Sequence, residues 1–385
     1  MEELHEILKA RTLPELYAAE DAFLAAHPGW EVAFRRYFLS DRVAQRAEIR
    51  PAEGAVSHIG QAPLDGNGAA VWLYLVRGAA VRRAPGVTAV EADGLVHWWT
   101  GDGIAPDATF GAAPDSYAQT DVVLRAYISF LEEHGMNLPE NCIRTWFFVH
   151  DIDNNYAGLV KSRREIFETQ GLTPKTHYIA STGINGSPVD PAALIQLDAY
   201  AIQGLPAEAQ HYLYAPTHLS PTSIYGVTFE RGVHVDYAGK AHSIISGTAS
   251  IDKDGQVVHV GDVIAQTDRM IENVGKLLEE SGAGFGDLKM AIVYLRNDAD
   301  YPLVRDRIAA LLGEMHGAAD SAHLFEQAHL QLNHLVCADV GAIVHNLFGA
   351  RITLSRVIGQ NATGIAPRAA HIAPSEAVGQ RRFGE

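Results

Sequence analysis

Arg231 and Arg144 are the basic side chains whose positions best suit the binding of a small anion. Arg231 lies on a predicted strand next to Glu230, and Arg144 lies at the start of another predicted strand. A guanidinium group binds a carboxylate through two parallel hydrogen bonds. The structural alternatives are a surface Arg231 paired with Glu230 or Asp236, and an Arg144 held in a salt bridge. Glu230 is the acid adjacent to these positions, so it is the candidate catalytic proton donor.

Five further residues are candidates for substrate binding, and each has a structural alternative. Tyr225 can hydrogen-bond a substrate, although an aromatic residue on a strand more often belongs to the core. Gly247 and Thr248 can let a ligand approach the backbone amides, or they can mark a bulge. Ser181 and Thr182 can offer hydroxyl groups to a polar substrate, or they can form an ordinary turn.

The sequence contains no convincing metal or nucleotide motif. Residues 151–155 begin like a calcium loop, but Tyr156 stands where that loop requires glycine. The glycines at 282–286 follow a predicted helix instead of a strand, which is wrong for a dinucleotide loop. The 18 histidines have no metal-ligand spacing. We therefore expect neither a metal nor a cofactor.

An internal repeat indicates which elements position the candidate residues. Residues 118–135 and 265–282 are identical at eight of eighteen positions, where chance predicts about one. The alignment continues without a gap, so that residues 142–149 correspond to 289–296. Arg144 corresponds to Ala291 in this alignment, which hints at a special role for Arg144. Two copies of one unit are the simplest interpretation.

Each copy predicts the same order of elements. An amphipathic helix ends at a glycine (Gly135 or Gly282), and a β-rich segment and a second amphipathic helix follow. The second helices are predicted at 156–170 and 301–312, and strands are predicted upstream at 71–76, 95–99, 226–236 and 243–251. Each unit is thus β-β-α-β-α. The predicted fold class is α+β, with two tandem units whose helices pack on one face of a mixed sheet.

The repeat also predicts how the chain is divided. Residues 1–170 form an N-terminal degenerate unit with an N-terminal extension, and 222–315 form the C-terminal unit. Residues 171–221 are rich in Gly, Pro, Thr and His and lack a long periodic segment, so we expect a long connection. Residues 316–385 form a divergent C-terminal segment, and from Arg356 onward we expect a disordered tail.

Composition limits the classes of partner. The 385 residues include 30 Lys and Arg against 46 Asp and Glu, which gives a net charge of −16. Because phosphate contacts need a basic face, we expect no nucleic-acid partner. The longest apolar run, 69–76, is only strand-sized, and the first residues do not resemble a signal peptide. With only Cys142 and Cys337, the chain fits a cytoplasmic protein without membrane contact.

The second copy resembles the Rid (YjgF-like) superfamily. The motifs that carry the resemblance are SGTAS at 246–250, GQVVHVGD at 255–262, and Gln266, Thr267 and Asn273. Three other segments resemble the two-unit branch that includes the chorismatases: RTWFFVHDID at 144–153, HYIASTG at 177–183 and YGVTFER at 225–231. The resemblance covers roughly residues 30–313.

The resemblance implies a fold like that of monofunctional chorismate mutase, with the active-site cleft beside the C-terminal unit. Rid enzymes hydrolyse imines and enamines with an Arg that binds the substrate carboxylate and a Glu that places water. Chorismatases split the enol ether of chorismate and release pyruvate, with a C-terminal Glu as the acid. A partly desolvated Glu has a raised pKa and can deliver a proton near neutral pH. Single-unit Rid proteins are trimers, so we expect a homotrimer or a monomer whose two units form a pseudo-dimer.

The chain departs from this pattern at its C-terminal end. Both families end in a strand with Arg followed by a Val-Glu-Ile-Glu-like run, and no such strand follows Asp298. Residues 335–338 and 349–351 are only weak echoes of it. Our hypothesis is that divergence or a frameshift replaced the terminal segment, which leaves the active site incomplete.

Three functions follow from these observations. The first is an enzyme of the Rid superfamily that hydrolyses a chorismatase-like enol ether in a small carboxylate substrate. The second is an imine or enamine deaminase of the Rid type, and the third is a non-catalytic metabolite-binding protein. Some relatives are called endoribonucleases or translation inhibitors, but the acidic charge gives no reason to expect that activity here.

Overall fold

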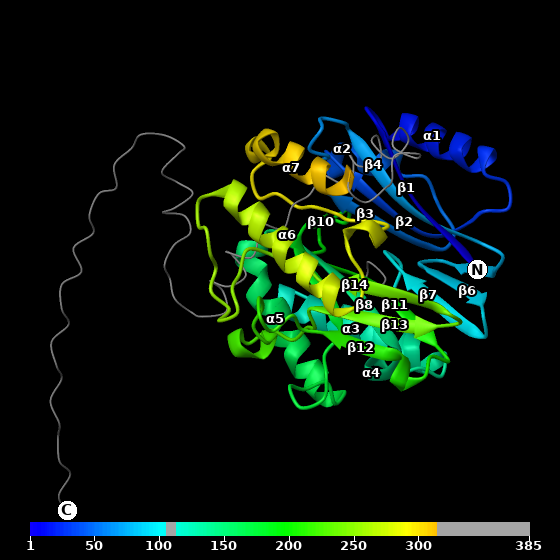
Figure 1. Ribbon diagram of the computed structural model, residues 1–385. Coiled ribbons are helices and arrows are strands. Elements are labelled where there is room, and N and C mark those ends of the chain that lie inside the picture. The colour runs from blue at the N-terminus through cyan, green and yellow to red at the C-terminus, as the bar shows by residue number, and fades with distance from the viewer. Residues whose placement is uncertain (105–112, 314–385) are drawn as a thin grey trace, which may run out of the picture. The chain divides into compact units, whose positions relative to one another are not determined.

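The computed structural model describes residues 1–104 and 113–313, and their strands form three sheets (Figure 1). The first sheet has the order β1-β4-β2-β3-β10, with β2 and β3 parallel and the other pairs antiparallel. Its strands are β1 (Glu2–Ala10), β2 (Glu31–Leu39), β3 (Ala55–Gly60), β4 (Ala69–Arg77) and β10 (Ser187–Pro188).

Helix α1 (Leu13–Ala26) covers part of this first sheet. Thr12 caps the helix and forms a capping box with Glu15, which satisfies backbone N–H groups that have no partner within the helix. Its buried residues Leu13 and Leu16 pack against Leu73 on β4. The sequence pattern predicted the strand at 71–76, which is β4, but it did not assign β1, α1 or β2.

The second sheet has the order β5-β6-β7-β11-β8-β9, in which only β8 and β9 are parallel. The strands are β5 (Ala80–Ala84), β6 (Val87–Ala92), β7 (Leu95–Thr100), β8 (Cys142–Val149), β9 (Ala180–Asn185) and β11 (Ile195–Gln203). Helices α3 (Ser116–Glu133) and α5 (Ile152–Thr169) pack on it through Leu124, Tyr127 and Leu159, in one cluster with Phe147 of β8. This arrangement confirms the predicted α+β class, with helices on a mixed sheet.

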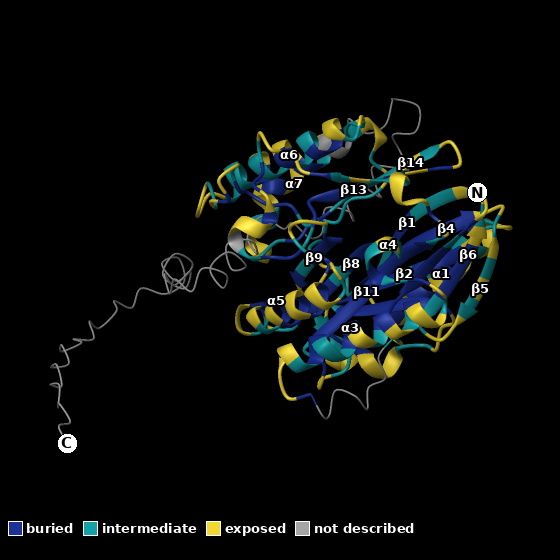
Figure 2. Ribbon diagram, turned by 90° about the horizontal axis from the view of Figure 1, so that it is seen from below, coloured by how far each residue is buried: buried dark blue, intermediate teal, exposed yellow. Residues whose placement is uncertain are grey.

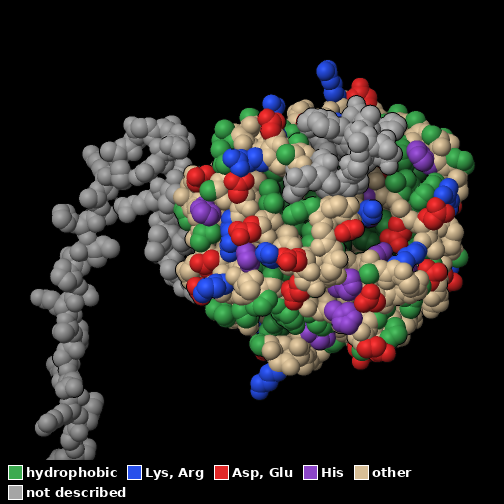
Figure 3. All heavy atoms as spheres, viewed as in Figure 1, with side chains coloured by type: hydrophobic (Ala, Val, Ile, Leu, Met, Phe, Trp, Pro, Cys, Tyr) green, Lys and Arg blue, Asp and Glu red, His purple; other side chains and the backbone are tan. Residues whose placement is uncertain are grey.

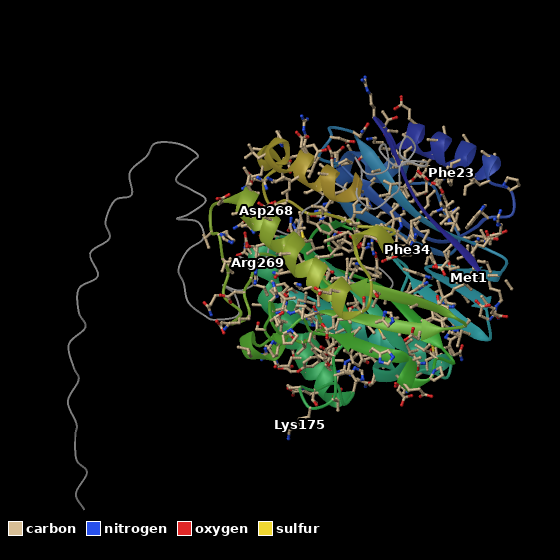
Figure 4. The ribbon with its side chains drawn as sticks, in the orientation of Figure 1. Met1, Phe23, Phe34, Lys175, Asp268 and Arg269 are labelled. Carbon is tan, nitrogen blue, oxygen red and sulfur yellow. The ribbon has the colours of Figure 1, made fainter. Side chains whose placement is uncertain are left out.

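The third sheet has the order β12-β13-β14; helix α6 of the second copy contacts β14, and α7 packs against α6. These elements are β12 (Gln210–Leu213), β13 (Gly232–Tyr237), β14 (Lys240–Ile245), α6 (Val263–Glu280) and α7 (Tyr301–Gly313). Figures 1 and 2 both show α6 and α7 side by side. Asp268 of α6, labelled in Figure 4, binds Arg307 of α7 at 2.6 and 2.7 Å. The next residue, Arg269, binds the carbonyl oxygens of Ile251 and His218.

The short helices lie in the connections between these elements. They are α2 (Arg42–Gln45), α4 (Leu138–Asn141), η1 (Arg46–Glu48), η3 (Ala207–Ala209), η4 (Thr222–Tyr225), η5 (Phe285–Asp287) and η6 (Asp298–Asp300).

Two sequence-based expectations need correction. Residues 171–221 were expected to be a connection, but β9, β10, β11 and β12 lie within them, and β11 is a central strand. Conversely, residues 246–251 and 289–296 are not assigned to strands. A strand is defined by hydrogen bonds to a neighbouring strand, and within the described ranges these two segments have no such neighbour apart from a single bridge between Ile251 and Val257.

An aromatic core joins the first two sheets. Phe34 of β2, labelled in Figure 4, contacts Trp72 of β4 and Trp99 of β7 with ring centroids 5.4 and 5.1 Å apart. Trp99 also stacks on Tyr200 of β11 at 4.5 Å. Figure 2 shows β4 and β11 mostly in the dark blue of buried residues. These large buried rings make the space between the sheets apolar, so a charged side chain there needs a partner.

The surface is mixed in charge. On the face seen in Figure 3, Lys and Arg side chains are interspersed with Asp and Glu, with no large basic area. Among the helices of residues 1–104 and 113–313, none is both long and apolar enough to cross a membrane.

Candidate functional site

Arg144 forms the centre of the candidate site. It lies on β8, and only 4% of its surface is exposed. Its Nη1 donates a hydrogen bond to Ser246 Oγ at 3.1 Å, and its Nη2 donates one to Thr182 Oγ1 at 2.5 Å. Thr182 belongs to β9 and Ser246 directly follows β14, so the site joins the two copies of the repeat.

The register between β8 and β9 explains why Thr182 faces Arg144 and Ser181 does not. Arg144 pairs with Ala180 and Trp146 pairs with Thr182. Because side chains alternate along a strand, these four point to one face and Ser181 points to the other. The Ser181 hydroxyl accordingly lies 2.8 Å from Thr145 Oγ1. Of the two predicted hydroxyl residues, the structure therefore brings only Thr182 to the Arg144 guanidinium.

Ser246 organises the backbone around the guanidinium. Its hydroxyl accepts hydrogen bonds from Arg144 and from the backbone N–H of Ser181 at 2.9 Å, and it donates one to the carbonyl of Glu230 at 2.5 Å. The sequence pattern included Ser246 in a family motif but did not single it out as a site residue. Its position after β14 is what places it beside Arg144.

Gly247 and Thr248 lie at the same place. The backbone N–H of Gly247 donates to Thr182 Oγ1 at 2.9 Å, and a Cβ at Gly247 would lie 3.1 Å from Thr182 Cγ2. The hydroxyl of Thr248 donates to the carbonyl of Ser246 at 2.9 Å. Glycine at 247 therefore allows the segment after β14 to lie close to β9. From the sequence alone, this glycine predicted the close approach of a ligand instead.

Asn273 of α6 holds the segment that carries these residues. Its side-chain Nδ2 donates to the carbonyl oxygens of Ala249 and Ile251 at 2.8 and 3.0 Å, and the residue is fully buried. Segment 246–251 lacks a strand partner, so side-chain hydrogen bonds from α6 fix it instead. Asn273, part of the family motif, therefore has a structural role here.

Arg144 has no acidic partner among the described residues. Its hydrogen bonds go to two hydroxyl groups, and its Nε is buried without a hydrogen-bond partner. The pKa of Arg144 is lowered to about 9. Burial is the main cause, the charge of Arg36 acts in the same direction, and Tyr294 acts in the opposite direction. The predicted structural salt bridge is therefore absent from the described part of the chain.

Arg36 of β2 is the matched neighbour that does have an acidic partner. Its Nε and Nη2 donate to one carboxylate oxygen of Asp198 at 2.9 and 2.7 Å, and both residues are fully buried. The guanidinium carbons of Arg36 and Arg144 lie 4.8 and 4.9 Å from the ring centroid of Trp146. One tryptophan thus contacts two buried cations, of which only Arg36 is neutralised.

Tyr294 is a site residue that the sequence did not reveal. It is buried, and burial raises its pKa to about 12 although the charges of Arg36 and Arg144 oppose this. Its hydroxyl therefore keeps its proton at neutral pH. In the repeat Tyr294 aligns with Phe147, so an aromatic residue at this position looked like a core residue in both copies.

Arg231 and Glu230 face other surroundings. Arg231 is buried, not on the surface, and donates to the carbonyl of Ser220 at 2.9 and 3.3 Å. Glu230 accepts a hydrogen bond from the backbone N–H of Tyr178 at 2.7 Å. Burial raises the pKa of Glu230, and the charges that lower it come from His177 and Arg231. The Glu230 carboxyl thus bonds to the backbone of Tyr178, while the backbone carbonyl of Glu230 accepts from Ser246 beside Arg144.

Two predicted features lie outside what the structure describes. The backbone of Tyr225 belongs to η4, and its side chain is outside the described part. Residues 314–385, with the weak C-terminal echoes and the predicted tail, are also outside it. Among the described residues, no cluster of three or more His, Cys, Asp or Glu side chains is arranged to hold a metal ion.

The chemistry that this arrangement supports is the binding of an anion. A buried guanidinium with an N–H that has no partner, next to the hydroxyl group of Thr182, offers hydrogen-bond donors to one ligand. The surrounding aromatic residues lower the local polarity and strengthen such contacts.

Comparisons with known proteins find two kinds of likeness, one in sequence and one in fold. The chain is 35% identical over 79 residues to the 3-aminoacrylate deaminase RutC of Acinetobacter baylyi, which covers 20% of this chain and 63% of that protein. It is 33% identical over 70 residues to a RutC family protein of Pyrococcus abyssi, covering 18% and 55%. The chain thus spans less than two thirds of the length of these relatives. No family model matches the sequence.

A crystal structure of a chorismatase has a similar fold. The TM-score is 0.51 at 18% sequence identity, and the superposition covers 80% of this chain and 90% of the other. At this identity the likeness concerns the fold alone.

Proposed function

We propose that this chain, which has a chorismatase-like α+β fold and matches a RutC protein over 79 residues, binds a small carboxylate at Arg144 and hydrolyses an enol ether of the chorismate type. The observation that carries the proposal is the buried Arg144 guanidinium, which has hydroxyl partners but no acidic partner among the described residues.

The energetic argument favours an anionic ligand. An uncompensated buried charge costs several kcal/mol, and pairing with an opposite charge recovers part of that cost. A substrate carboxylate beside Arg144 would accept hydrogen bonds from the guanidinium, including the Nε–H that has no partner. The hydroxyl of Thr182 bonds to the same guanidinium, and the backbone N–H of Gly247 bonds to that hydroxyl. Both groups therefore border the proposed carboxylate position.

The proposed reaction consumes one water. A proton adds to the methylene carbon of the enol ether, water adds to the resulting cationic carbon, and the hemiketal collapses to pyruvate and an alcohol. Glu230 is the candidate acid because burial raises its pKa. Tyr294, which keeps its proton at neutral pH, is proposed to donate a hydrogen bond to the substrate beside Arg144.

Arg231, Tyr225, Ser181 and Thr248 remain proposed substrate-binding residues. Arg231 and Ser181 contact other groups in the structure, so a direct contact with substrate would require them to exchange those partners. Thr248 is the best placed of the four, because its hydroxyl bonds to the carbonyl of Ser246.

The first alternative is hydrolysis of an imine or enamine. It is favoured by the 79-residue match to the deaminase RutC. An anionic imine would use the same Arg144 contact. The second alternative is a non-catalytic metabolite-binding protein, which is favoured by the absence of the expected Arg and Glu strand from the sequence after Asp298.

Three assays on the full chain separate the three proposals. The full chain is incubated with chorismate, and pyruvate is followed with lactate dehydrogenase. We expect turnover that Arg144→Met abolishes and that Arg125→Met, at an exposed position on α3, leaves unchanged. No turnover above buffer would reject the chorismatase-like proposal. Faster loss of imine in a coupled amino-acid oxidase assay would then support the deaminase, and thermal stabilisation by chorismate without turnover would support the binding protein.

The state of assembly is a separate proposal. We propose a homotrimer or a monomer with two pseudo-dimeric units, and light scattering of the full chain distinguishes them.

A further inference from the structure

Segment 289–296, between α6 and α7, has the side-chain pattern of a strand. Ile292 and Tyr294 belong to an apolar cluster that includes a residue of β8, whereas Val293 and Leu295 belong to a second cluster that includes residues of α7. Alternation with a period of two is typical of an extended chain, and apolar contacts on both faces are typical of a central strand.

The backbone of this segment lacks the partners that a central strand has. The backbone groups of residues 289–293 form no hydrogen bond with another described residue. Val293 is only 7% exposed, and buried backbone N–H and C=O groups in folded proteins are nearly always paired. An extended backbone with free N–H and C=O groups is a template to which a further strand can add. Segment 289–293 is therefore a docking surface for an extended partner.

The first copy of the repeat shows where in the chain such a partner lies. Segment 289–296 corresponds to β8 in the repeat. Strand β8 pairs antiparallel with β11, which follows the second helix of the first copy, α5. In the second copy the corresponding helix is α7, and the description of the structure ends with it at Gly313. The counterpart of β11 is thus expected in the chain after α7.

A constant offset of 147 residues relates the two copies and identifies this counterpart. It carries the ends of α3, Ser116 and Glu133, onto the ends of α6, Val263 and Glu280. It also carries the start of α5 to within two residues of the start of α7. The same offset carries β11 onto residues 342–350, whose sequence is AIVHNLFGA. The Ile, Val and Phe of this sequence favour a strand.

We propose that residues 342–350 of this chain dock on segment 289–296 as an antiparallel strand, the counterpart of β11 in the second copy of the repeat. A segment of the same chain has an advantage over one from another molecule, because a short tether gives it a high effective concentration. The docking does not depend on the function proposed for Arg144.

The first copy also supplies the register of this pairing. Asp198 of β11 is paired with Trp146 of β8, and the offset carries these two residues onto His345 and Val293. Paired residues in antiparallel strands have Cα atoms about 4.5–5.5 Å apart, which is within the range that a disulfide bridges. Cysteines at the two positions should therefore form a disulfide.

Cysteine cross-linking of the full chain tests the pairing. Val293→Cys is combined with substitution of each of residues 342–348 by cysteine in turn, in a Cys337→Ser background. Native Cys142 does not compete, because it is buried and burial raises its pKa to about 12. We expect an intrachain disulfide that is strongest with His345→Cys and weaker at its neighbours, since side chains alternate along a strand. Ser375→Cys, outside the proposed strand, is the matched control.

Hydrogen exchange of the unmodified chain gives a second measurement that needs no cysteine variant. The amides of residues 290–293 should exchange at least about tenfold more slowly than unstructured backbone. Val344→Pro removes a backbone N–H from the proposed strand and should restore fast exchange at 290–293. Val378→Pro, outside the proposed strand, should not. Unchanged exchange in β8 verifies that each proline variant keeps its fold.

Each measurement can overturn the proposal. Cross-linking that at no position from 342 to 348 exceeds the Ser375→Cys control would do so. Disulfide-linked dimers in place of the intrachain product would show that another molecule of this chain is the occupant. Fast exchange at 290–293 in the unmodified chain, or exchange there that Val344→Pro does not change, would show that residues 342–350 do not cover this segment.

Discussion

Replacing Arg144 with methionine should stabilise the folded chain while it removes ligand binding. The pKa of Arg144 falls to about 9, from an ordinary guanidinium value above about 12. Each pKa unit corresponds to about 1.4 kcal/mol. At neutral pH the folded chain therefore carries this buried charge at a cost of roughly 4 kcal/mol, which Arg144→Met removes.

Lost hydrogen bonds offset part of that gain. Arg144→Met removes two hydrogen bonds to hydroxyl groups, worth roughly 1 kcal/mol each. Thr182 and Ser246 keep other partners, because they also accept from the backbone N–H groups of Gly247 and Ser181. The expected net effect is a gain of about 1–3 kcal/mol in the free energy of unfolding, in the range reported for replaced buried charges.

Arg36→Met is the matched control for this experiment. Arg36 is equally buried and contacts the same Trp146, but it is paired with Asp198 at 2.7 Å. Removing it leaves a buried carboxylate without its partner, so we expect a loss of about 3–5 kcal/mol. Urea denaturation at pH 7 without ligand measures both variants.

The pH dependence gives an independent reading of the same charge. A base with a lowered pKa in the folded state destabilises that state below this pKa, because the unfolded chain holds the proton more tightly. The advantage of Arg144→Met should therefore be largest below pH 9 and should shrink as the pH rises above about 9. A loss of more than about 2 kcal/mol for Arg144→Met would refute the reasoning, since it would mean that an acid compensates the guanidinium.

Three further predictions concern the surroundings of this charge. Gly247→Ala places a Cβ 3.1 Å from Thr182 Cγ2, so we expect at least tenfold lower kcat/KM for chorismate, with a change in stability below about 1 kcal/mol in urea denaturation. Burial raises the pKa of Glu230, so ionising this carboxyl destabilises the folded state once the pH rises above the ordinary glutamate range. The stability of Glu230→Gln relative to the unmodified protein should therefore be greater at pH 8 than at pH 5. Thermal unfolding at both pH values tests this, and an equal stability difference between the two proteins at pH 5 and pH 8 contradicts it. Asn273→Ala removes two buried hydrogen bonds and should cost about 2–3 kcal/mol in urea denaturation, while a neutral effect would mean that α6 does not hold segment 246–251.

The sequence by itself determined the elements that rest on local periodicity. Helices α3 and α6 begin within two residues of the repeated segments at 118–135 and 265–282. The apolar stripe of each helix and the glycine after its last turn can be identified from the sequence alone. The α+β class followed from the same repeat, the resemblance to the Rid superfamily followed from the motifs at 246–273, and both are confirmed.

Strands were harder to predict, because a strand depends on partners that lie far away in the chain. Strand β11 pairs with β7 and with β8, about 50 to 100 residues earlier. The same dependence explains why residues 289–296, which have a β-rich pattern, are not a strand in the described part of the chain.

The candidate site likewise could be predicted only in part from the sequence. The sequence determined which residue types were available: an arginine at 144, hydroxyl groups at 181 and 182, and a glycine at 247. Only the tertiary structure decided that Thr182 faces Arg144 while Ser181 faces Thr145, since strand register sets the direction of each side chain. It also decided that Arg36 has a carboxylate partner and that Arg144 has none among the described residues. Charge compensation depends on distances between segments that the order of residues does not specify.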